Sequence, residues 1–201
     1  MIRVLVAEDM RILRDTLVAA LELEDDIDVV AALDRGESIV DTAVAERVDL
    51  CLLDIDLPGM DGLTAATALR TGLPDCRVLI LTALANPGHL KRAMEIGVSG
   101  FILKDTPRRE LLVAVRTVAA GGRVLDPELA FTALRTPDCP LTDREIDVLR
   151  CLAAGADPRE IAVQLSLTYG TVRNYLASSV AKLQARNRVD AIRIATASGW
   201  L

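Results

Sequence analysis

Acidic side chains stand at the ends of two short apolar runs that we predict to be β-strands. Glu8 and Asp9 follow the run 2–7, and Asp54 ends the run 50–54. If these strands are neighbours in a parallel sheet, their carboxyl ends meet at one edge and three carboxylates lie together. Crowded carboxylates repel one another, and Mg²⁺ relieves this repulsion while keeping coordination positions for water or a phosphate oxygen. The pattern therefore predicts a Mg²⁺ site, although for any single acid a solvated strand end is the simpler interpretation.

A hydroxyl and an ammonium group complete this set. Thr82 ends the apolar run 77–82, and Lys104 follows the run 99–103. A carboxylate that attacks a phosphoryl donor needs its charge offset and needs donors for the phosphoryl oxygens. Asp54 can attack, Mg²⁺ and Lys104 can neutralise charge, and Thr82 can donate a hydrogen bond. Alone, Lys104 or Thr82 would be unremarkable, so the prediction of phosphoryl chemistry depends on the joint occurrence.

Short strand-like runs alternate with longer segments of helical period, which is typical of an α/β fold with a doubly wound, five-stranded parallel sheet. The expected strands are 2–7, 28–32, 50–54, 77–82 and 99–103, and the expected helices lie near 10–23, 36–46, 62–71, 87–96 and 107–120. In such a sheet the ligand site lies at the carboxyl ends of the strands, where the polar residues stand.

The second half of the chain has a different pattern. Three prolines and the pair Gly121-Gly122 interrupt the alternation of strand-like and helical segments. This interruption predicts a first domain over 1–120 and a linker over 121–140. A small all-α domain then covers 141–201, with helices at 141–154, 158–165, 169–183 and 189–198. Asp157-Pro158 and Thr168 are the expected start signals of the second and third of these helices.

The expected helix 169–183 has two unlike faces. Val172, Leu176, Val180 and Leu183 follow the helical period and should face a core. The opposite face carries Arg173, Asn174, Ala177, Ser178, Ala181 and Lys182. Hydrogen-bonding heads beside small residues suit a helix that enters the DNA major groove, and the preceding short helix and turn give helix-turn-helix spacing. A solvated face with incidental charge is the alternative for a lone amphipathic helix.

Charge and composition agree with two unlike domains. The formal net charge of the 201 residues is −6, but residues 1–126 carry 14 basic against 21 acidic residues, whereas residues 168–201 carry 5 against 1. We expect no membrane insertion, because no run approaches roughly 18 apolar residues, and a cytoplasmic location, because the chain begins directly as a strand. The four cysteines stand singly, without metal-ligand spacing, and are expected to be buried, reduced thiols.

Residues 1–120 resemble the receiver domain of bacterial response regulators. The matching motifs are Val6-Ala7-Glu8-Asp9, Leu53 to Gly62, Leu81-Thr82-Ala83 and Gly100 to Lys104. The resemblance implies a flavodoxin-like fold with Asp54 as phospho-acceptor and with Glu8 and Asp9 as Mg²⁺ ligands. It also implies a backbone-carbonyl ligand from Asp56, and Thr82 and Phe101 as a switching hydroxyl and aromatic.

Residues 141–201 are similar to the helix-turn-helix of the NarL/LuxR (FixJ) class of regulators. The similarity rests on Leu141 to Glu145, Glu160-Ile161-Ala162, Gly170 to Tyr175 and Lys182-Leu183. Thr171 to Leu176 and the ending Gly199-Trp200-Leu201 particularly resemble a Gram-positive subgroup that regulates membrane-lipid desaturase. The resemblance implies that DNA is contacted by Thr171, Arg173, Asn174, Ala177, Lys182 and Arg188, with Asn174 and Ala177 nearest the bases and Arg188 on the backbone.

Together these patterns predict a transcriptional regulator switched by Asp54 phosphorylation. The expected partners are a sensor histidine kinase, double-stranded promoter DNA, a second copy of the chain after phosphorylation and RNA polymerase. Excess apolar residues in the helices near 10–23 and 107–120 predict that these helices form the dimer surface, unless another part of the same chain covers them. Two other classes stay open: an aspartyl-phosphate phosphatase, and a phosphorylation-independent adaptor.

Overall fold

A computed structural model describes residues 1–83, 87–125 and 139–201. The chain divides into two compact units, which are described separately. The predicted linker, residues 121–140, lies largely outside the described residues.

The first unit is built on a five-stranded parallel sheet in the order β2-β1-β3-β4-β5. The strands are β1 (Ile2–Ala7), β2 (Ile27–Leu33), β3 (Leu50–Asp54), β4 (Arg77–Thr82) and β5 (Gly100–Leu103). All of β3 and all of β4 except Arg77 are buried, as expected for central strands covered on both faces. The predicted doubly wound sheet is confirmed, and each predicted strand is present within one residue at either end.

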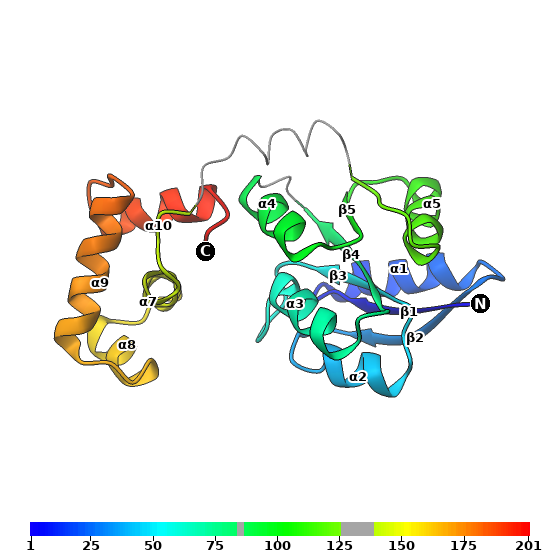
Figure 1. The fold of residues 1–201 in the computed structure, drawn as a ribbon, viewed down its shortest axis with the longest axis horizontal. Coiled ribbons are helices and arrows are strands. Elements are labelled where there is room, and N and C mark those ends of the chain that lie inside the picture. Colours follow the sequence, from blue (N-terminus) through cyan, green and yellow to red (C-terminus); the bar gives the residue numbers. More distant parts are fainter. Residues whose placement is uncertain (84–86, 126–138) are drawn as a thin grey trace. The chain divides into compact units, whose positions relative to one another are not determined.

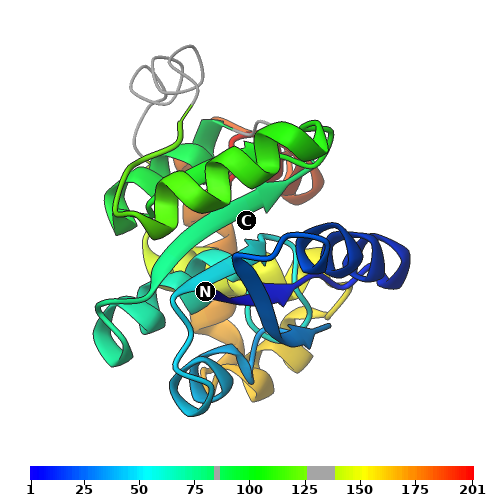
Figure 2. The ribbon, with the colours of Figure 1, turned by 90° about the vertical axis from the view of Figure 1, so that its right-hand side faces the viewer.

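Helices cover both faces of this sheet (Figures 1 and 2). They are α1 (Arg11–Glu22), α2 (Ile39–Ala45), α3 (Gly62–Gly72), α4 (Pro87–Ile96) and α5 (Arg108–Ala119). Apolar residues of α1 and α5 form one core with the sheet, and apolar residues of α2, α3 and α4 form the core on the other face. Because the connections are crossovers, the loops after the carboxyl ends of β1, β3, β4 and β5 meet at one edge.

The second unit consists of helices around a small core of its own. They are α7 (Asp143–Ala153), α8 (Pro158–Gln164), α9 (Tyr169–Lys182) and α10 (Arg188–Ala197). Asp157 caps α8 in a capping box with Glu160, and Thr168 caps α9 by accepting a hydrogen bond from the Thr171 N–H, as predicted. The turn between α8 and α9 includes Ser166 at φ 54°, a left-handed conformation that ends α8 sharply.

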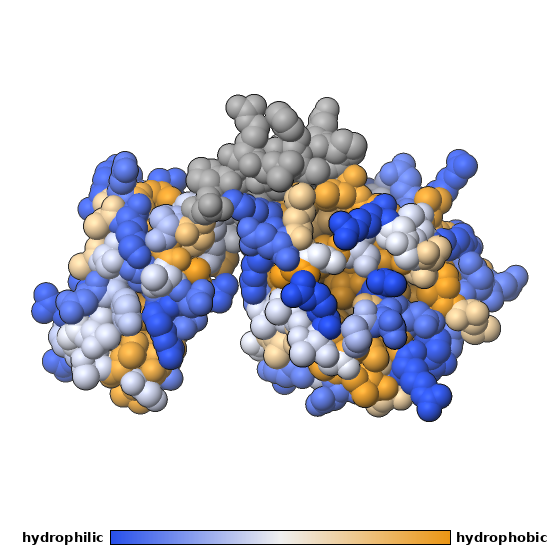
Figure 3. Space-filling view, viewed as in Figure 1, coloured by the Kyte–Doolittle hydropathy of each residue, from blue (hydrophilic) through white to orange (hydrophobic). Residues whose placement is uncertain are grey.

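Both units expose a mixed surface. On the face seen in Figure 3, hydrophilic side chains predominate and apolar patches lie between them. Among the described residues, no helix combines the length and the apolar character that crossing a membrane requires.

The four cysteines are all free. Cys51 and Cys76 are buried, and their sulfur atoms lie 3.6 Å apart on the α3 side of the sheet. Cys139 and Cys151 are only half-buried, which corrects the expectation that all four are core residues. They lie at the margin of the core of the second unit, which is too small to enclose every apolar side chain.

Candidate functional site

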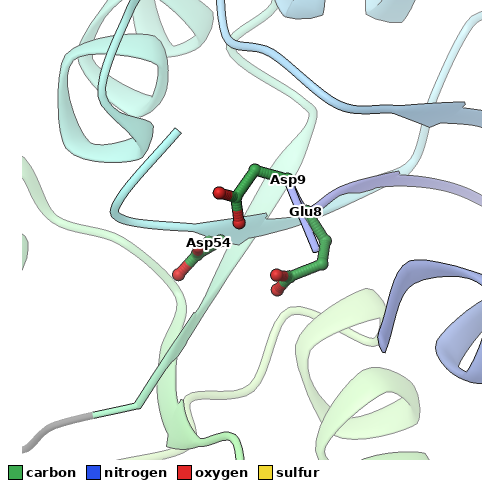
Figure 4. A group of neighbouring side chains, drawn as sticks. All are labelled: Glu8, Asp9 and Asp54. Carbon is green, nitrogen blue, oxygen red and sulfur yellow. The ribbon is translucent and has the colours of Figure 1, made fainter. Parts of the chain in front are cut away.

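Three carboxylates meet at the carboxyl edge of the sheet, as the sequence predicts (Figure 4). Glu8 and Asp9 follow β1, Asp54 ends β3, and the two strands are hydrogen-bonded neighbours. One oxygen from each carboxylate lies within 4.8 Å of the others. Glu8 and Asp54 are 0% and 2% exposed, whereas Asp9 is exposed. Two buried carboxylates beside a third are costly unless a cation compensates them.

Lys104 supplies part of this compensation. Its ammonium nitrogen lies 2.8 Å from Glu8 Oε2 and 3.0 Å from Asp54 Oδ2. The side chain is 14% exposed, so the ion pairs are largely shielded from water. The backbone N–H of Lys104 donates to the Thr82 carbonyl at 2.7 Å, which ties the end of β5 to the end of β4.

The buried groups perturb one another's protonation. Burial raises the pKa of Asp54 and of Glu8 above their ordinary values, although hydrogen bonds from Lys104 act in the opposite direction. Burial also acts to lower the pKa of Lys104, but hydrogen bonds to Glu8 and Asp54 outweigh this and the pKa of the ammonium is raised. Lys104 is therefore a stable positive charge beside Asp54.

The acidic group fits a magnesium ion. Asp54 Oδ1 is buried and has no hydrogen-bond partner among the described residues, so one carboxylate oxygen is left for a ligand. Carboxylate oxygens are the ligands that Mg²⁺ prefers. Asp56 is exposed. The resemblance to receiver domains implies that its backbone carbonyl, and not its side chain, is a Mg²⁺ ligand.

The two predicted switch residues lie on the neighbouring strands. Thr82 ends β4 and is 2% exposed, and Phe101 lies in β5 and is also 2% exposed. β4 and β5 are paired so that Thr82 is opposite Leu103, two residues from Phe101. The ring of Phe101 belongs to the core on the α4 side of the sheet.

Arg14 and the pair Asp61–Arg92 are contributors that the sequence interpretation missed. Arg14 on α1 donates from Nη1 to the Glu8 carbonyl at 2.7 Å and holds the loop that carries two of the acids. Asp61 caps α3 by accepting from the Thr64 N–H, and Arg92 of α4 lies 3.3 Å from the same carboxylate. The Asp61 position, just before a helix and three residues before a threonine, was a readable N-cap signal. Arg14 carries no such signal.

In the second unit, α9 presents the expected polar face. Val172, Leu176 and Leu183 are buried and Val180 is packed against the same core, which confirms the predicted core stripe. A hollow of about 380 Å³ lies beside this stripe and is lined by Arg173, Leu176, Ala177, Val180, Asn187 and Arg188. Three of the six predicted DNA contacts therefore share one surface depression, with an apolar floor and a basic rim.

Lys182, another predicted contact, has a partner inside its own domain. Its ammonium lies 2.7 Å from Glu145 Oε2, and Ser178 Oγ donates to Glu145 Oε1 at 2.5 Å. Glu145 is buried in α7 and also closes a capping box with Thr142. Despite burial, hydrogen bonds from Lys182, Ser178 and Thr142 lower the pKa of Glu145 to about 2. The Thr-x-x-Glu pattern is a readable capping-box signal that the sequence interpretation missed, whereas the link of Glu145 to α9 has no such signal.

The remaining predicted contacts are placed at the ends of α9 and α10. Arg173 and Asn174 are exposed, and the Arg173 guanidinium lies 6.0 Å from the centroid of the Tyr169 ring. Thr171 is half-buried, with its hydroxyl 2.8 Å from the Thr168 hydroxyl. Arg188 begins α10 directly after its cap, Asn187, and is exposed. Arg173 and Asn174 thus lie on the exposed side of α9, whereas Ser178 and Lys182 face α7.

Comparison with known families matches both units. Residues 4–116 match the response regulator receiver domain, and residues 139–195 match the bacterial regulatory proteins of the luxR family. The chain belongs to the two-component response regulators of the NarL/LuxR family. It is 43% identical over 201 residues to the transcriptional regulatory protein DesR of Bacillus subtilis, covering 100% of this chain and 99% of that one. It is 41% identical over 202 residues to the response regulator RamR of Streptomyces coelicolor, covering 100% and 98%.

Solved structures agree with this family assignment. The crystal structure of ChrA, the response regulator of a heme-sensing two-component system, is 33% identical with a TM-score of 0.58 and covers 100% of this chain and 98% of that one. RcsB from Salmonella enterica serovar Typhimurium, bound to the promoter rprA in the presence of the phosphomimetic BeF₃⁻, is 22% identical with a TM-score of 0.69, covering 97% and 98%. The RcsB similarity shows the shared fold. The regulator therefore combines a receiver with a LuxR-type DNA-binding domain and belongs to a family that regulates transcription.

Proposed function

We propose that this regulator receives a phosphoryl group on Asp54 from a sensor histidine kinase and then binds promoter DNA as a dimer. The observation that carries the proposal is the buried Asp54 carboxylate, which pairs with Lys104 through one oxygen and leaves the other oxygen without a partner among the described residues. Such an arrangement suits a nucleophile that is held in place and keeps one oxygen for an incoming phosphorus atom.

In the proposed reaction, an Asp54 oxygen attacks the phosphorus of a phosphohistidine. The new oxygen–phosphorus bond forms as the nitrogen–phosphorus bond breaks, and the histidine leaves with the electron pair of that bond. Lys104 offsets negative charge on the phosphoryl oxygens, and Thr82 offers its hydroxyl to them. Glu8, Asp9, Asp54 and the Asp56 carbonyl would hold Mg²⁺, which offsets the charge of the acceptor and of the phosphoryl group. Self-dephosphorylation would release phosphate from the same position.

Arg14 would act on this reaction through the loop geometry. Because its guanidinium holds the Glu8 carbonyl, it fixes the β1–α1 loop that presents Glu8 and Asp9.

The proposed scheme describes a regulatory switch and not a phosphatase, because each chain would retain one phosphoryl group. Incubation with acetyl phosphate and Mg²⁺ tests the proposal: the protein should take up one group per chain, and its affinity for promoter duplex should rise. Multiple turnover on small phosphate esters would favour the enzyme alternative instead.

The proposed DNA contacts are Thr171, Arg173, Asn174, Ala177, Lys182 and Arg188. The hollow beside Arg173 supports them, because it brings two guanidinium groups next to small and apolar side chains. Arginine reads guanine edges and alkyl groups contact the thymine methyl in the major groove. Lys182 would contribute less charge than its sequence position suggests, because Glu145 already pairs with it.

Replacing Arg173 by Ala should weaken binding to the cognate promoter by roughly 1–3 kcal/mol, because a side chain that reads a base edge is lost. Fluorescence anisotropy of a labelled duplex at fixed salt measures the change. Arg150→Ala is the matched control: it removes the same charge from an exposed position of α7 and should change affinity far less. Equal affinities of Arg173→Ala and the parent would remove Arg173 from the DNA-reading surface. Loss of salt dependence in the parent would favour an adaptor.

The proposed dimer uses the outer side of α1 and α5. Five apolar residues of α5 are buried, so the helix leaves less apolar surface exposed than the sequence predicted; they are Leu111, Leu112, Ala114, Val115 and Val118. Val113 is 57% exposed and Ile12 of α1 is 83% exposed. A hollow of about 380 Å³ beside Val113 offers a second copy a place to pack. Arg116 of α5 forms ion pairs with Glu24 and Asp26 after α1, which holds the two helices in register.

A charge at Val113 should block this association. Val113→Arg is expected to leave phosphorylation unchanged and to keep the phosphorylated protein monomeric, because a guanidinium would have to be buried in the interface. Sedimentation velocity of phosphorylated and unphosphorylated protein provides the measurement. Val163→Arg, at an 81% exposed position of α8, is the control and should dimerise as the parent does. Dimers of Val113→Arg as stable as those of the parent would place the interface elsewhere.

A further inference from the structure

The chain returns to the sheet immediately after α5. Val124 forms a parallel bridge with Gly100 of β5. The Val124 N–H donates to the Ser99 carbonyl at 3.1 Å, and the Phe101 N–H donates to the Val124 carbonyl at 2.9 Å. β5 is the last strand of the sheet, so this contact adds a short strand at its free edge. We call residues 123–125 the edge segment.

The edge segment also contacts the side-chain environment of the switch. Leu125 packs against the core that contains Phe101. A hollow of about 100 Å³ lies here, and the side chains around it come from α4, β5 and the edge segment. Among them are Leu90, Ala93, Met94, Phe101, Val124 and Leu125. Phe101 therefore has unfilled space beside it, and all three residues of the edge segment line this space.

Gly100 permits this close packing. A Cβ atom at Gly100 would lie 2.6 Å from Leu79 Cδ1, 3.2 Å from Val118 Cγ2 and 3.3 Å from the Val124 carbonyl oxygen. A side chain at this position would press first on the Leu79 side chain and would crowd the Val124 carbonyl oxygen. A glycine at position 100 therefore suits the close approach of Val124 to β5.

We propose that Val124 and Leu125 are positioning residues that couple Phe101 to the linker. When Phe101 moves in response to phosphorylation, its backbone carries the hydrogen bond to Val124 with it and its ring changes the packing at Leu125. The chain that leads to the DNA-binding domain begins at these two residues. A local change at Asp54 would thereby be passed on through these hydrogen bonds and this packing to the residues that lead into the linker. This inference rests on the proposed function and adds to it the path by which the switch acts.

The test uses three variants of the full-length protein. Val124→Pro removes the N–H that bonds to Ser99, whereas Val124→Ala keeps it and removes only two methyl groups. Leu125→Ala removes the side chain that packs near Phe101. For each variant, the number of phosphoryl groups taken up from acetyl phosphate, the melting temperature and the affinity for promoter duplex before and after phosphorylation are measured.

Uncoupling is the expected result. Val124→Pro and Leu125→Ala should take up one phosphoryl group per chain as the parent does, while the fold increase in DNA affinity on phosphorylation falls toward one. Val124→Ala should keep most of the parent's increase. A merely structural role would lower phosphorylation and melting temperature together and would leave the ratio of the two affinities intact.

Two results would overturn the inference. One is an unchanged affinity ratio in Leu125→Ala and in a folded Val124→Pro; if Val124→Pro does not fold, Leu125→Ala decides. The other is an equal loss of the phosphorylation-dependent increase in DNA affinity in Val124→Ala and Val124→Pro. That result would show that the backbone hydrogen bond of Val124 to Ser99 does not contribute to the coupling. A parent that becomes phosphorylated without any gain in DNA affinity would contradict the proposed function itself, and the inference would fall with it. The parent's own ratio therefore separates the two failures.

Discussion

Asp54→Asn should abolish phosphoryl uptake from acetyl phosphate. Asparagine keeps the size and the hydrogen-bonding oxygen of the side chain but has no charged oxygen that can attack phosphorus. Among the three clustered acids, Asp54 is the one that ends a buried central strand. Its carboxylate contacts Lys104 through Oδ2, and its Oδ1 has no hydrogen-bond partner among the described residues. Intact-protein mass spectrometry should show one added phosphoryl group on the parent and none on the variant.

Asp56→Asn is the matched control for this experiment. Its side chain is exposed and the role implied for this residue belongs to the backbone carbonyl, so labelling should stay close to that of the parent. Asp54→Asn should also lose the gain in DNA affinity, because no charge change reaches the switch. Labelling of Asp54→Asn at the level of the parent would show that another residue is the acceptor.

Glu145→Gln should destabilise the DNA-binding domain by roughly 1–3 kcal/mol, because hydrogen bonds to a buried charged group contribute about this much. The substitution leaves Lys182 without its carboxylate partner and weakens the capping box at Thr142. Trp200 is the single tryptophan of the chain and packs against the core of this domain, so its fluorescence reports unfolding of this unit in the full-length protein. Urea titration followed at Trp200 should give a lower midpoint for Glu145→Gln.

The pH dependence of the same transition provides a second measurement. The pKa of Glu145 is about 2 in the folded state against an ordinary value of 4.5. The folded state therefore binds this proton less readily, so the stabilisation is complete above about pH 4.5 and is lost as the pH falls toward 2. The parent should lose stability over this range more steeply than Glu145→Gln. Asp143→Asn, at an exposed position two residues earlier, should behave as the parent does. Superimposable pH profiles of parent and Glu145→Gln would contradict the role of this ion pair.

The link between Glu145 and α9 bears on DNA binding as well as on stability. Ser178 and Lys182 lie on α9, and both donate to the same buried carboxylate of α7. A recognition helix must be held rigidly to present several side chains to the bases at once. If Lys182 contacts DNA as proposed, its charge would be divided between holding α9 and contacting DNA, whereas Arg173 is exposed and has no carboxylate partner in α7 among the described residues.

The acidic cluster at the strand ends shows how much of the site local sequence patterns predict. Glu8, Asp9, Asp54, Thr82 and Lys104 were predicted to gather, because parallel strands present their carboxyl ends at one edge of a sheet. The structure brings Glu8, Asp9, Asp54 and Lys104 together and places Thr82 at the end of the neighbouring β4. The strand and helix periods predicted this edge, and the observed strand order made β1 and β3 neighbours there.

Other features of the same site have no local pattern. Arg14 reaches the Glu8 carbonyl because α1 packs beside β1, and Arg92 reaches Asp61 because α4 packs beside α3. Long charged side chains occur on every exposed helix face, so their spacing does not distinguish a tertiary partner from water. The amount of apolar surface left on α5 was also overestimated, because five of its residues are covered by the sheet and by α1.

The sequence by itself predicted the two kinds of domain, the bounds of each strand and helix to within a few residues, and the gathering of acidic side chains at the strand ends. These properties follow from periodicity, capping residues and local charge, all of which act over a few neighbouring positions. Only the tertiary structure decided which residues far apart in the chain contact one another: Cys51 with Cys76, Glu145 with Lys182, and Val124 with the edge of β5. Such contacts depend on how complete elements pack, and many sequences with the same local pattern would place different side chains at those points of contact.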